Sequence, residues 1–266
     1  RGMSSAASDV YKRQTPGLTA QRWRRLVLLG LLYLVQGMPF GFQVGALPIF
    51  LHEQGVSLEA IGFSTALALP WALKFLWAPF VESRGGHAGS RKRWIVPLQF
   101  AMAGGFLLAA TLDLPGQLPL LMGLLFALNA LAATQDVAVD GLAVDLLPPD
   151  ELGVDNAAQV VGFKGGMTVS GGILVWLTAQ IDWAGAFACM AFIIAGVAVL
   201  VWVTPEPKRS PQSPAEVKPT FWGIVATVRG AMLQPGMVTV VAVIGGYKMG
   251  ESIIDVMFKP FLMEHG

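Results

Sequence analysis

The stretch "LPLLMGLLFALNALAATQDVAVDGLAVDLLP", residues 118–148, decides the fold, because it joins a long apolar run to three carboxylates. Residues 118–135 carry no charged side chain, and about 20 consecutive apolar residues suffice to cross the hydrocarbon core of a bilayer. Asp136, Asp140 and Asp145 then follow at the end of the run. Either the run leaves the membrane before Asp136, or at least two of these carboxylates are buried for a purpose.

The composition of the whole chain matches that of this stretch. Of the 266 residues, 54% are hydrophobic and 13% are charged, with a mean hydropathy of +0.60. A soluble domain carries about 25% charged residues, and a transmembrane barrel would show alternating residues in place of continuous apolar runs. The composition therefore predicts an all-α polytopic membrane protein. Cys189 is the only cysteine, so no intrachain disulfide can form.

The apolar runs predict seven membrane spans, at about residues 26–51, 58–81, 94–112, 118–147, 156–179, 183–203 and 237–262. Basic residues precede the first span and lie between spans two and three and between spans six and seven, whereas the loops after spans one, three and five contain no lysine or arginine. Because basic loops stay in the cytoplasm, we expect a cytoplasmic amino terminus and a multi-pass protein of the bacterial inner membrane.

The chain divides into four segments. Residues 1–20 form a tail, and residues 1–14 are either a cloning or sequencing scar or a native disordered segment. Residues 21–203 form a six-helix bundle, and residues 204–220, "TPEPKRSPQSPAEVKPT", form a flexible cytoplasmic linker. Residues 221–266 contain a surface helix and the seventh span.

An internal repeat indicates that the chain is part of a longer protein. The segment "PIFLHEQG" (48–55) in the first span resembles "KPFLMEHG" (259–266) at the end of the seventh. Transporters are often built from two parallel halves of six spans each. We therefore expect a fragment of a protein of about twelve spans, which stops after the first span of the second half.

Helical geometry separates the three aspartates of span four. A rotation of about 100° per residue places Asn129, Asp136 and Asp140 on one face and Asp145 on another. At a rise of about 1.5 Å per residue, Asp136 and Asp140 lie about 18 and 12 Å inside Pro148. We expect Asp145 to be solvated at the cytoplasmic edge or to cap the loop.

Two lysines lie at the same depth as these aspartates. Lys74 in span two and Lys164 in span five are each about 12–14 Å from the cytoplasmic end of their spans. An intramembrane charge is costly unless it is paired or hydrated, so we expect Lys74, Lys164, Asp136 and Asp140 to pair around a water-filled cavity. The alternative is that the lysines extend toward the headgroups.

The first and seventh spans carry polar stripes as well. In span seven, four charged residues spaced three and four apart share one helical face, and they either face a polar interior or satisfy one another within the helix. These are Lys248, Glu251, Asp255 and Lys259. Tyr33, Gln36 and Gln43 form an uncharged stripe in span one.

Several of these segments resemble the major facilitator superfamily, and most closely its AmpG-like muropeptide permeases and acetyl-coenzyme A transporters. They are "QGMPFG" (36–41), "KFLWAPFVES" (74–83), "SRKRW" (90–94), "ATQDVAVDGLAVDLLPPDELG" (133–153), "VGFKGGMTVSGG" (161–172) and "YKMGES" (247–252). The resemblance implies two six-helix bundles, a central cavity and alternating access driven by the proton gradient. It also suggests anhydro-muropeptides, or a related bulky solute, as cargo.

The loop between spans two and three resembles the superfamily signature Gly-x-x-x-Asp-Arg/Lys-x-Gly-Arg/Lys-Arg/Lys only in part. Ala78 stands where the signature has Gly, and Glu82 stands where it has Asp. The resemblance implies a cytoplasmic gating loop that contains Glu82, Arg84, Arg91, Lys92 and Arg93.

The leading functional hypothesis is a secondary active transporter that is not an enzyme and needs no cofactor, metal or nucleic acid. Its partners would be a small or medium-sized solute, protons and the lipid bilayer. A buried Asp136 or Asp140 would carry the proton, and lysines would hold an anionic group of the solute. The predicted pathway residues are Asp136, Asp140, Lys164, Lys74, Asn129, Gln36, Lys248, Glu251 and Asp255.

A membrane-embedded transferase is the rival hypothesis. Asp136 and Asp140, four residues apart, could hold Mg²⁺ against the diphosphate of a prenyl or phosphatidyl donor. The lysines at the same depth favour charge neutralisation over metal capture. A membrane scaffold without transport activity is a third possibility, and nothing in the sequence supports it.

Overall fold

A computed structural model of the chain describes residues 20–85, 91–113, 116–146, 152–204 and 221–247. All regular structure within these ranges is helical, which confirms the predicted all-α fold. The chain divides into two compact units, Arg1–Lys218 and Pro219–Gly266, which are described separately. Among the described residues, 4 helices are long and apolar enough to cross a membrane, or up to 6 if each bent pair is one span. The protein is therefore a multi-pass membrane protein.

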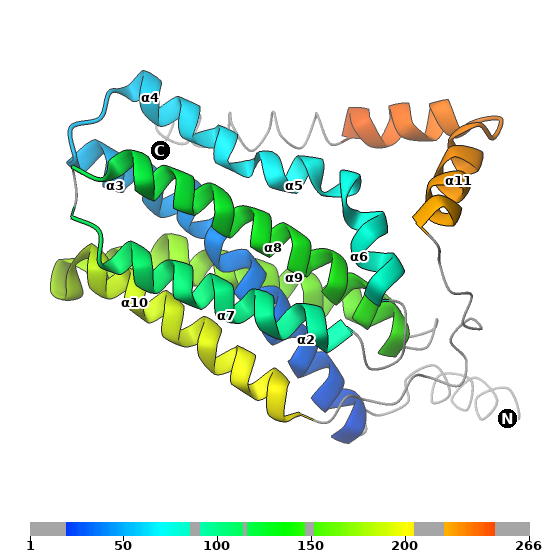
Figure 1. Cartoon of the computed structure of the whole chain (residues 1–266), viewed down its shortest axis with the longest axis horizontal. Helices are drawn as coiled ribbons and strands as arrows, with labels where there is room; N and C mark the ends of the chain where they lie inside the picture. Colours follow the sequence, from blue (N-terminus) through cyan, green and yellow to red (C-terminus); the bar gives the residue numbers. More distant parts are fainter. Residues whose placement is uncertain (1–19, 86–90, 114–115, 147–151, 205–220, 248–266) are drawn as a thin grey trace, which may run out of the picture. The chain divides into compact units, whose positions relative to one another are not determined.

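The first unit is a bundle of long helices (Figure 1). Span one is α2 (Ala20–Gly41), a π-helical segment η1 (Phe42–Ala46) and α3 (Leu47–Glu53). Spans three and four are α7 (Arg91–Ala110) and α8 (Leu118–Leu146). The next two spans run through α9 (Leu152–Thr168), the π-helical segment η5 (Val169–Ile173) and α10 (Leu174–Val203).

The predicted fifth and sixth spans are joined by a sharp break at Asp182. The helical run Asn156–Val203 has 48 residues, more than twice the length that a bilayer requires. Asp182 interrupts it with a φ of 56° and a ψ of −177°, a strained conformation for a residue that has a side chain. The backbone N–H of Gly185 donates to Asp182 Oδ1 at 2.7 Å, which caps the helix that follows. The chain turns back at the left-hand end of Figure 1.

Span two is broken into short pieces. It consists of α4 (Leu58–Phe63), η2 (Ser64–Ala68), α5 (Leu69–Leu73), η3 (Lys74–Leu76) and α6 (Ala78–Gly85), and it bends by 53° between η3 and α6. Pro70 and Pro79 lack the backbone N–H that would continue the α-helical ladder. The hydroxyl of Ser64 donates to Ile61 O at 2.7 Å, a local bond that competes with regular helix.

Glycines let α2 pack closely on α9. A Cβ on Gly37 would lie 2.2 Å from Phe163 O, and one on Gly166 would lie 2.0 Å from Leu34 O. Only residues without a side chain permit such an approach, so the run "GGMTVSGG" (165–172) contributes a helix-packing face. The core around this contact is aliphatic and aromatic, with Leu29, Met38 and Phe187 fully buried.

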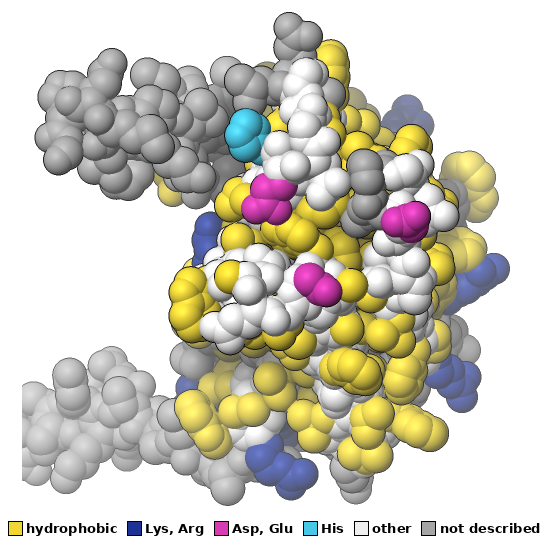
Figure 2. All heavy atoms as spheres, turned by 90° about the vertical axis from the view of Figure 1, so that its left-hand side faces the viewer, with side chains coloured by type: hydrophobic (Ala, Val, Ile, Leu, Met, Phe, Trp, Pro, Cys, Tyr) yellow, Lys and Arg dark blue, Asp and Glu magenta, His cyan; other side chains and the backbone are white. Residues whose placement is uncertain are grey.

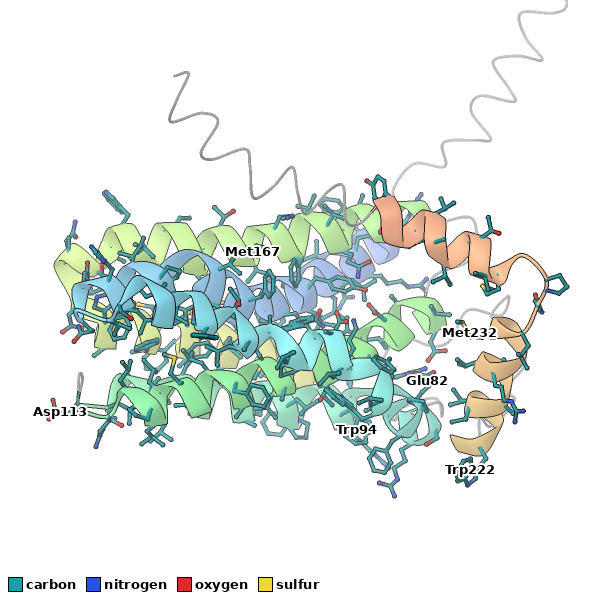
Figure 3. The ribbon with its side chains drawn as sticks, turned by 90° about the horizontal axis from the view of Figure 1, so that it is seen from above. Glu82, Trp94, Asp113, Met167, Trp222 and Met232 are labelled. Atoms are coloured by element: carbon teal, nitrogen blue, oxygen red, sulfur yellow. The ribbon has the colours of Figure 1, made fainter. Side chains whose placement is uncertain are left out.

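The two ends of the bundle differ in the charge of their side chains. The basic end contains the start of α2, with Arg22, Arg24 and Arg25, and the start of α7, with Arg91. The opposite, acidic end exposes Glu53, Asp113 and Asp182. Figure 2 looks onto the acidic end and shows acidic side chains and one histidine among apolar and uncharged atoms. In Figure 3, Glu82 and Asp113 mark the two ends.

The second unit is described only in part. It contains α11 (Phe221–Met232) and a further helix, Met237–Tyr247, bent from it by 89°. The further helix begins where the seventh span was predicted to begin. The predicted pathway residues Lys248, Glu251 and Asp255, together with Lys259, lie outside the described residues.

Candidate functional site

The first unit has an open cavity of about 400 Å³ between spans two, four and five, here named the polar cavity. The four charged residues that were predicted to share one depth all line it. Its lining residues are Trp71, Lys74, Asp136, Asp140, Asn156, Gln159, Val160, Phe163 and Lys164. The predicted convergence of three helices on one polar space is therefore present in the structure.

Asp136 and Lys74 form an ion pair on the wall of this cavity. Asp136 is only 4% exposed, and its Oδ2 accepts a hydrogen bond from Lys74 Nζ. The ammonium also lies 5.7 Å from the ring centroid of Trp71, where the ring face attracts a cation. Lys74 is thus directed to a buried carboxylate rather than toward the headgroups.

The other polar residues of α8 are held by neighbouring helices. The hydroxyl of Tyr33 on α2 donates to Asp140 Oδ1 at 3.0 Å, and Tyr33 is only 1% exposed. The indole of Trp71 donates to Asn129 Oδ1 at 2.9 Å. The predicted face of Asn129, Asp136 and Asp140 therefore binds one partner from α2 and two from span two.

Lys164 and Gln36 differ from this pattern. Lys164 lines the polar cavity with an exposed side chain and has no ion-pair partner among the described residues. Gln36 is completely buried and is not among the residues that line the cavity, and its amide has no hydrogen-bond partner in the described part of the chain. Of the two predicted lysines, only Lys74 therefore has its charge neutralised by a described side chain.

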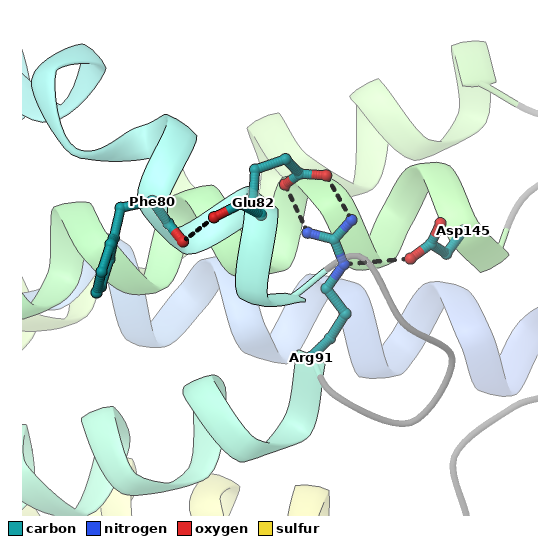
Figure 4. Close-up of polar contacts among 5 residues, drawn as sticks. Phe80, Glu82, Arg91 and Asp145 are labelled. Carbon is teal, nitrogen blue, oxygen red and sulfur yellow. Dashed lines mark hydrogen bonds and ion pairs between the residues drawn. The ribbon is translucent and has the colours of Figure 1, made fainter. Parts of the chain in front are cut away.

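A second cluster of charges lies at the basic end of the bundle (Figure 4). The guanidinium of Arg91 donates to both carboxylate oxygens of Glu82, at 2.6 and 2.7 Å, and its Nε donates to Asp145 Oδ2 at 3.2 Å. This Arg91 cluster ties α6, α7 and α8 together. Bidentate pairs of this kind are among the stronger charge-assisted hydrogen bonds.

The partner of Asp145 differs from the prediction. The sequence suggested a solvated or loop-capping carboxylate, but Asp145 is half-buried against Arg91. Gly141 explains this, because a Cβ there would lie 2.0 Å from Arg91 Nη1. The missing side chain lets the guanidinium lie on α8 and reach Asp145 one turn further along.

The rest of the predicted gating loop does not join this cluster. The guanidinium of Arg84 lies 4.0 Å from the ring centroid of Phe80, and Lys92 donates to the backbone oxygen of Thr204. Arg93 is exposed. The sequence placed Glu82 and Arg91 in one loop but did not predict their ion pair. It also did not identify Asp145 as a partner of Arg91, Tyr33 as a partner of Asp140, or Trp71 as a partner of Asn129.

A further cavity of about 480 Å³, the arginine cavity, connects the two charged groups. It is lined by Lys74 and Asp140 from the polar cavity and by Glu82, Arg91 and Asp145 from the Arg91 cluster. The two cavities share Lys74 and Asp140. The two cavities therefore lie next to each other, and the arginine cavity is the one nearer the basic end.

The arrangement does not fit the Mg²⁺ site that the transferase hypothesis requires. Asp136 is committed to Lys74, and Asp140 accepts a hydrogen bond from Tyr33. Within the described ranges, no group of three or more His, Cys, Asp or Glu side chains could hold a metal ion. An ammonium bound to one of the two carboxylates would also repel a divalent cation.

Comparison with known proteins now places the chain. Residues 25–184, more than half of the sequence, match the family described as acetyl-coenzyme A transporter 1. The chain belongs to this family. The matched region contains the polar cavity, the Arg91 cluster and the close contact between α2 and α9.

Individual relatives agree with the family. The chain is 25% identical to the anhydromuropeptide permease of Escherichia coli K12 over 241 residues, and this alignment covers 90% of the chain and 48% of the permease. It is 26% identical over 255 residues to the putative transporter AmpG 4 of Rickettsia felis, covering 91% of the chain and 60% of that protein. An uncharacterized protein of Schizosaccharomyces pombe is 34% identical over 177 residues, or 64% of the chain and 34% of that protein.

These findings confirm the resemblance to AmpG-like permeases. Two of these relatives are named as a permease and a putative transporter, in agreement with a chain that is not an enzyme. The chain spans about half the length of the curated relatives that it matches.

Proposed function

We propose that the chain forms one half of a secondary active transporter of the bacterial cytoplasmic membrane, which imports anhydro-muropeptides by alternating access with proton coupling. The ion pair between Asp136 and Lys74 carries this proposal. A half-buried ion pair on the wall of a polar cavity inside a membrane bundle is costly to maintain, and intramembrane charges of this kind mark ion and substrate pathways. The names of the relatives support the class of cargo.

Proton coupling follows from the two carboxylates of α8. Protonation of Asp136 would release the ammonium of Lys74, and protonation of Asp140 would change its bond with Tyr33. If the ammonium of Lys74 were drawn away from Asp136, a proton taken up by this carboxylate would replace the lost positive charge. An anionic group of the solute, bound by Lys74 and the exposed Lys164, would draw that cation away.

The Arg91 cluster would control access from one side. It ties α6, α7 and α8 together, and its residues line the arginine cavity next to the polar cavity. Separation of these helices would widen the access to the polar cavity from the basic end. We assign this end to the cytoplasm because arginines and lysines collect on the cytoplasmic side of membrane proteins.

Uptake of a labelled anhydro-muropeptide by cells that express the full-length protein tests the proposal. Asp136→Asn and Lys164→Ala should each abolish proton-driven uptake while the protein still reaches the membrane. Asp113→Asn, which changes an exposed carboxylate at the acidic end, is the matched control and should transport normally. Unchanged uptake by both Asp136→Asn and Lys164→Ala would reject the assigned roles.

A further inference from the structure

Three aromatic rings from three spans meet beside the polar cavity. Phe40 on α2 lies 6.1 Å from Trp71 on α5 and 5.9 Å from Phe163 on α9, measured between ring centroids. Trp71 and Phe163 are 5.8 Å apart. Each ring therefore contacts the other two at distances typical of packed aromatic pairs. The three rings are named here the ring cluster.

The ring cluster stands between two cavities. Trp71 and Phe163 line the polar cavity, whereas Phe40 lines a separate cavity of about 340 Å³, here named the glutamine cavity. The glutamine cavity lies toward the acidic end and is lined by Phe40, Gln43, Val44, Pro48, Ile61, Gly62, Ser64, Thr65 and Ala68. The two cavities share no lining residue.

Both cavities offer polar groups to a solute. Gln43 is only 3% exposed; its Nε2 donates to Ser64 O at 3.4 Å, while its Oε1 has no hydrogen-bond partner among the described residues. A buried carbonyl oxygen without a partner costs free energy until a hydrogen-bond donor reaches it. A hydroxyl or amide N–H of a passing solute would supply that donor.

We propose that the ring cluster is the gate between the glutamine cavity and the polar cavity, and that the glutamine cavity is a second, outer subsite for the solute. The proposal rests on the proposed transport function, because it treats the two cavities as successive stations on one path. In the present conformation the three packed rings place apolar surface between the two cavities.

Irregular backbone next to each ring gives the gate a means to move. Phe40 precedes the π-helical segment Phe42–Ala46, and Trp71 lies between two 3₁₀ segments, Ser64–Ala68 and Lys74–Leu76. Phe163 precedes the π-helical segment Val169–Ile173. Mid-helix segments of these kinds often mark functional hinges.

Access of a membrane-impermeant thiol reagent tests the gate without requiring transport. In a cysteine-free version of the full-length protein, Gln159→Cys reports on the polar cavity and Thr65→Cys on the glutamine cavity. A methanethiosulfonate ammonium reagent is applied to right-side-out and inverted vesicles. We expect Thr65→Cys to react from the acidic-end side and Gln159→Cys to react only from the basic-end side.

Removing a ring should open the barrier. With Phe40→Ala added, Gln159→Cys should gain reaction from the acidic-end side, and its reaction from the basic-end side should stay unchanged, which also shows that the variant is folded. Trp71→Phe keeps a ring but loses the bond to Asn129, so it should keep the gate closed. Phe126→Ala, at a 43% exposed position on α8, is the matched control and should change nothing.

Two results would overturn the proposal that the ring cluster is a gate. One is unchanged access in Phe40→Ala and also in Phe163→Ala, and the other is equal access in the control Phe126→Ala. The milder variant Phe40→Leu replaces Phe40→Ala if the latter fails to reach the membrane. Because labelling is measured without solute or proton gradient, a failed gate leaves the uptake test of Asp136 and Lys164 unaffected, and the reverse also holds.

Discussion

Spans two and four hold the two sides of the central ion pair, and they are built in opposite ways. Span four is one unbroken α-helix, Leu118–Leu146, whereas span two is a series of short α and 3₁₀ pieces with a bend of 53°. Asp136 lies on the regular helix and Lys74 on the broken one. A fixed carboxylate thus faces a cation on a backbone that can rearrange.

This difference indicates that the two spans have different roles in the bundle. A continuous helix keeps Asn129, Asp136 and Asp140 in one row, because every backbone group is satisfied within the helix. The broken span brings Trp71 and Lys74 to that row through side-chain bonds, which can be exchanged without unfolding α8. We therefore expect span two to change its position during transport while span four keeps its position in the bundle.

A proline introduced into span four should produce the largest loss of stability. Ala127 is an exposed position within α8, so Ala127→Pro disturbs the backbone and little else. We expect a destabilisation of about 3 kcal/mol, as for other prolines inside helices. The reciprocal change, Pro70→Ala in span two, should alter stability much less. Thermal unfolding in detergent micelles compares the two, and equal losses would contradict the division of roles.

Filling the space at Gly141 should have the next largest effect. A Cβ there meets the guanidinium of Arg91 at 2.0 Å, so Gly141→Leu displaces Arg91 from Glu82 and Asp145. Overpacking of this kind costs about 1–3 kcal/mol. Gly123→Leu, at an exposed glycine with open space around it on the same helix, is the control. Unfolding temperatures should fall for Gly141→Leu alone, and a similar fall for both would indicate a general effect of helix glycines.

Replacement of Arg91 by lysine should have a smaller effect. Arg91→Lys keeps the positive charge but cannot make two parallel bonds to Glu82 while also reaching Asp145. The loss of one or two net hydrogen bonds predicts a destabilisation of about 1–2 kcal/mol. Arg93→Lys, on an exposed arginine of the same helix, should be neutral in the same unfolding assay. A neutral Arg91→Lys would mean that the cluster contributes through charge alone.

The smallest effect is expected at the acidic end. Asp182 has a φ of 56° and its carboxylate caps the following helix, so Asp182→Asn keeps both features and should change stability by less than about 0.5 kcal/mol. Asp182→Ala loses the cap, so it should cost about 1 kcal/mol. The two variants are compared by unfolding, and equal values would show that the break does not depend on this residue.

The sequence predicted the spans and the polar face of span four because both follow from local periodicity. The face of Asn129, Asp136 and Asp140 is a property of one regular helix. The division of span two into short pieces, which include Pro70 and Pro79, was not predicted. The partners of the carboxylates in span four were harder to predict. The contact of Arg91 with Asp145 depends on the register of α7 against α8 and on a glycine, Gly141, whose role is visible only when the helices are packed.

The ring cluster illustrates the same limit. Phe40, Trp71 and Phe163 lie far apart in an apolar sequence, where aromatic residues are expected on any face. Their meeting point depends on the broken backbone of span two and on the close approach of α2 and α9 through glycines. A pattern within a single span carries no information about such an approach.

Proton movement during solute uptake tests the central claim most directly. In proteoliposomes that contain the full-length protein and an interior pH indicator, addition of anhydro-muropeptide should drive protons inward with the solute. Asp136→Asn should abolish this proton signal, and Asp145→Asn should reduce it without abolishing it, because Asp145 lies in the Arg91 cluster and not on the ion pair. Solute-driven proton uptake of normal size in Asp136→Asn would contradict the account.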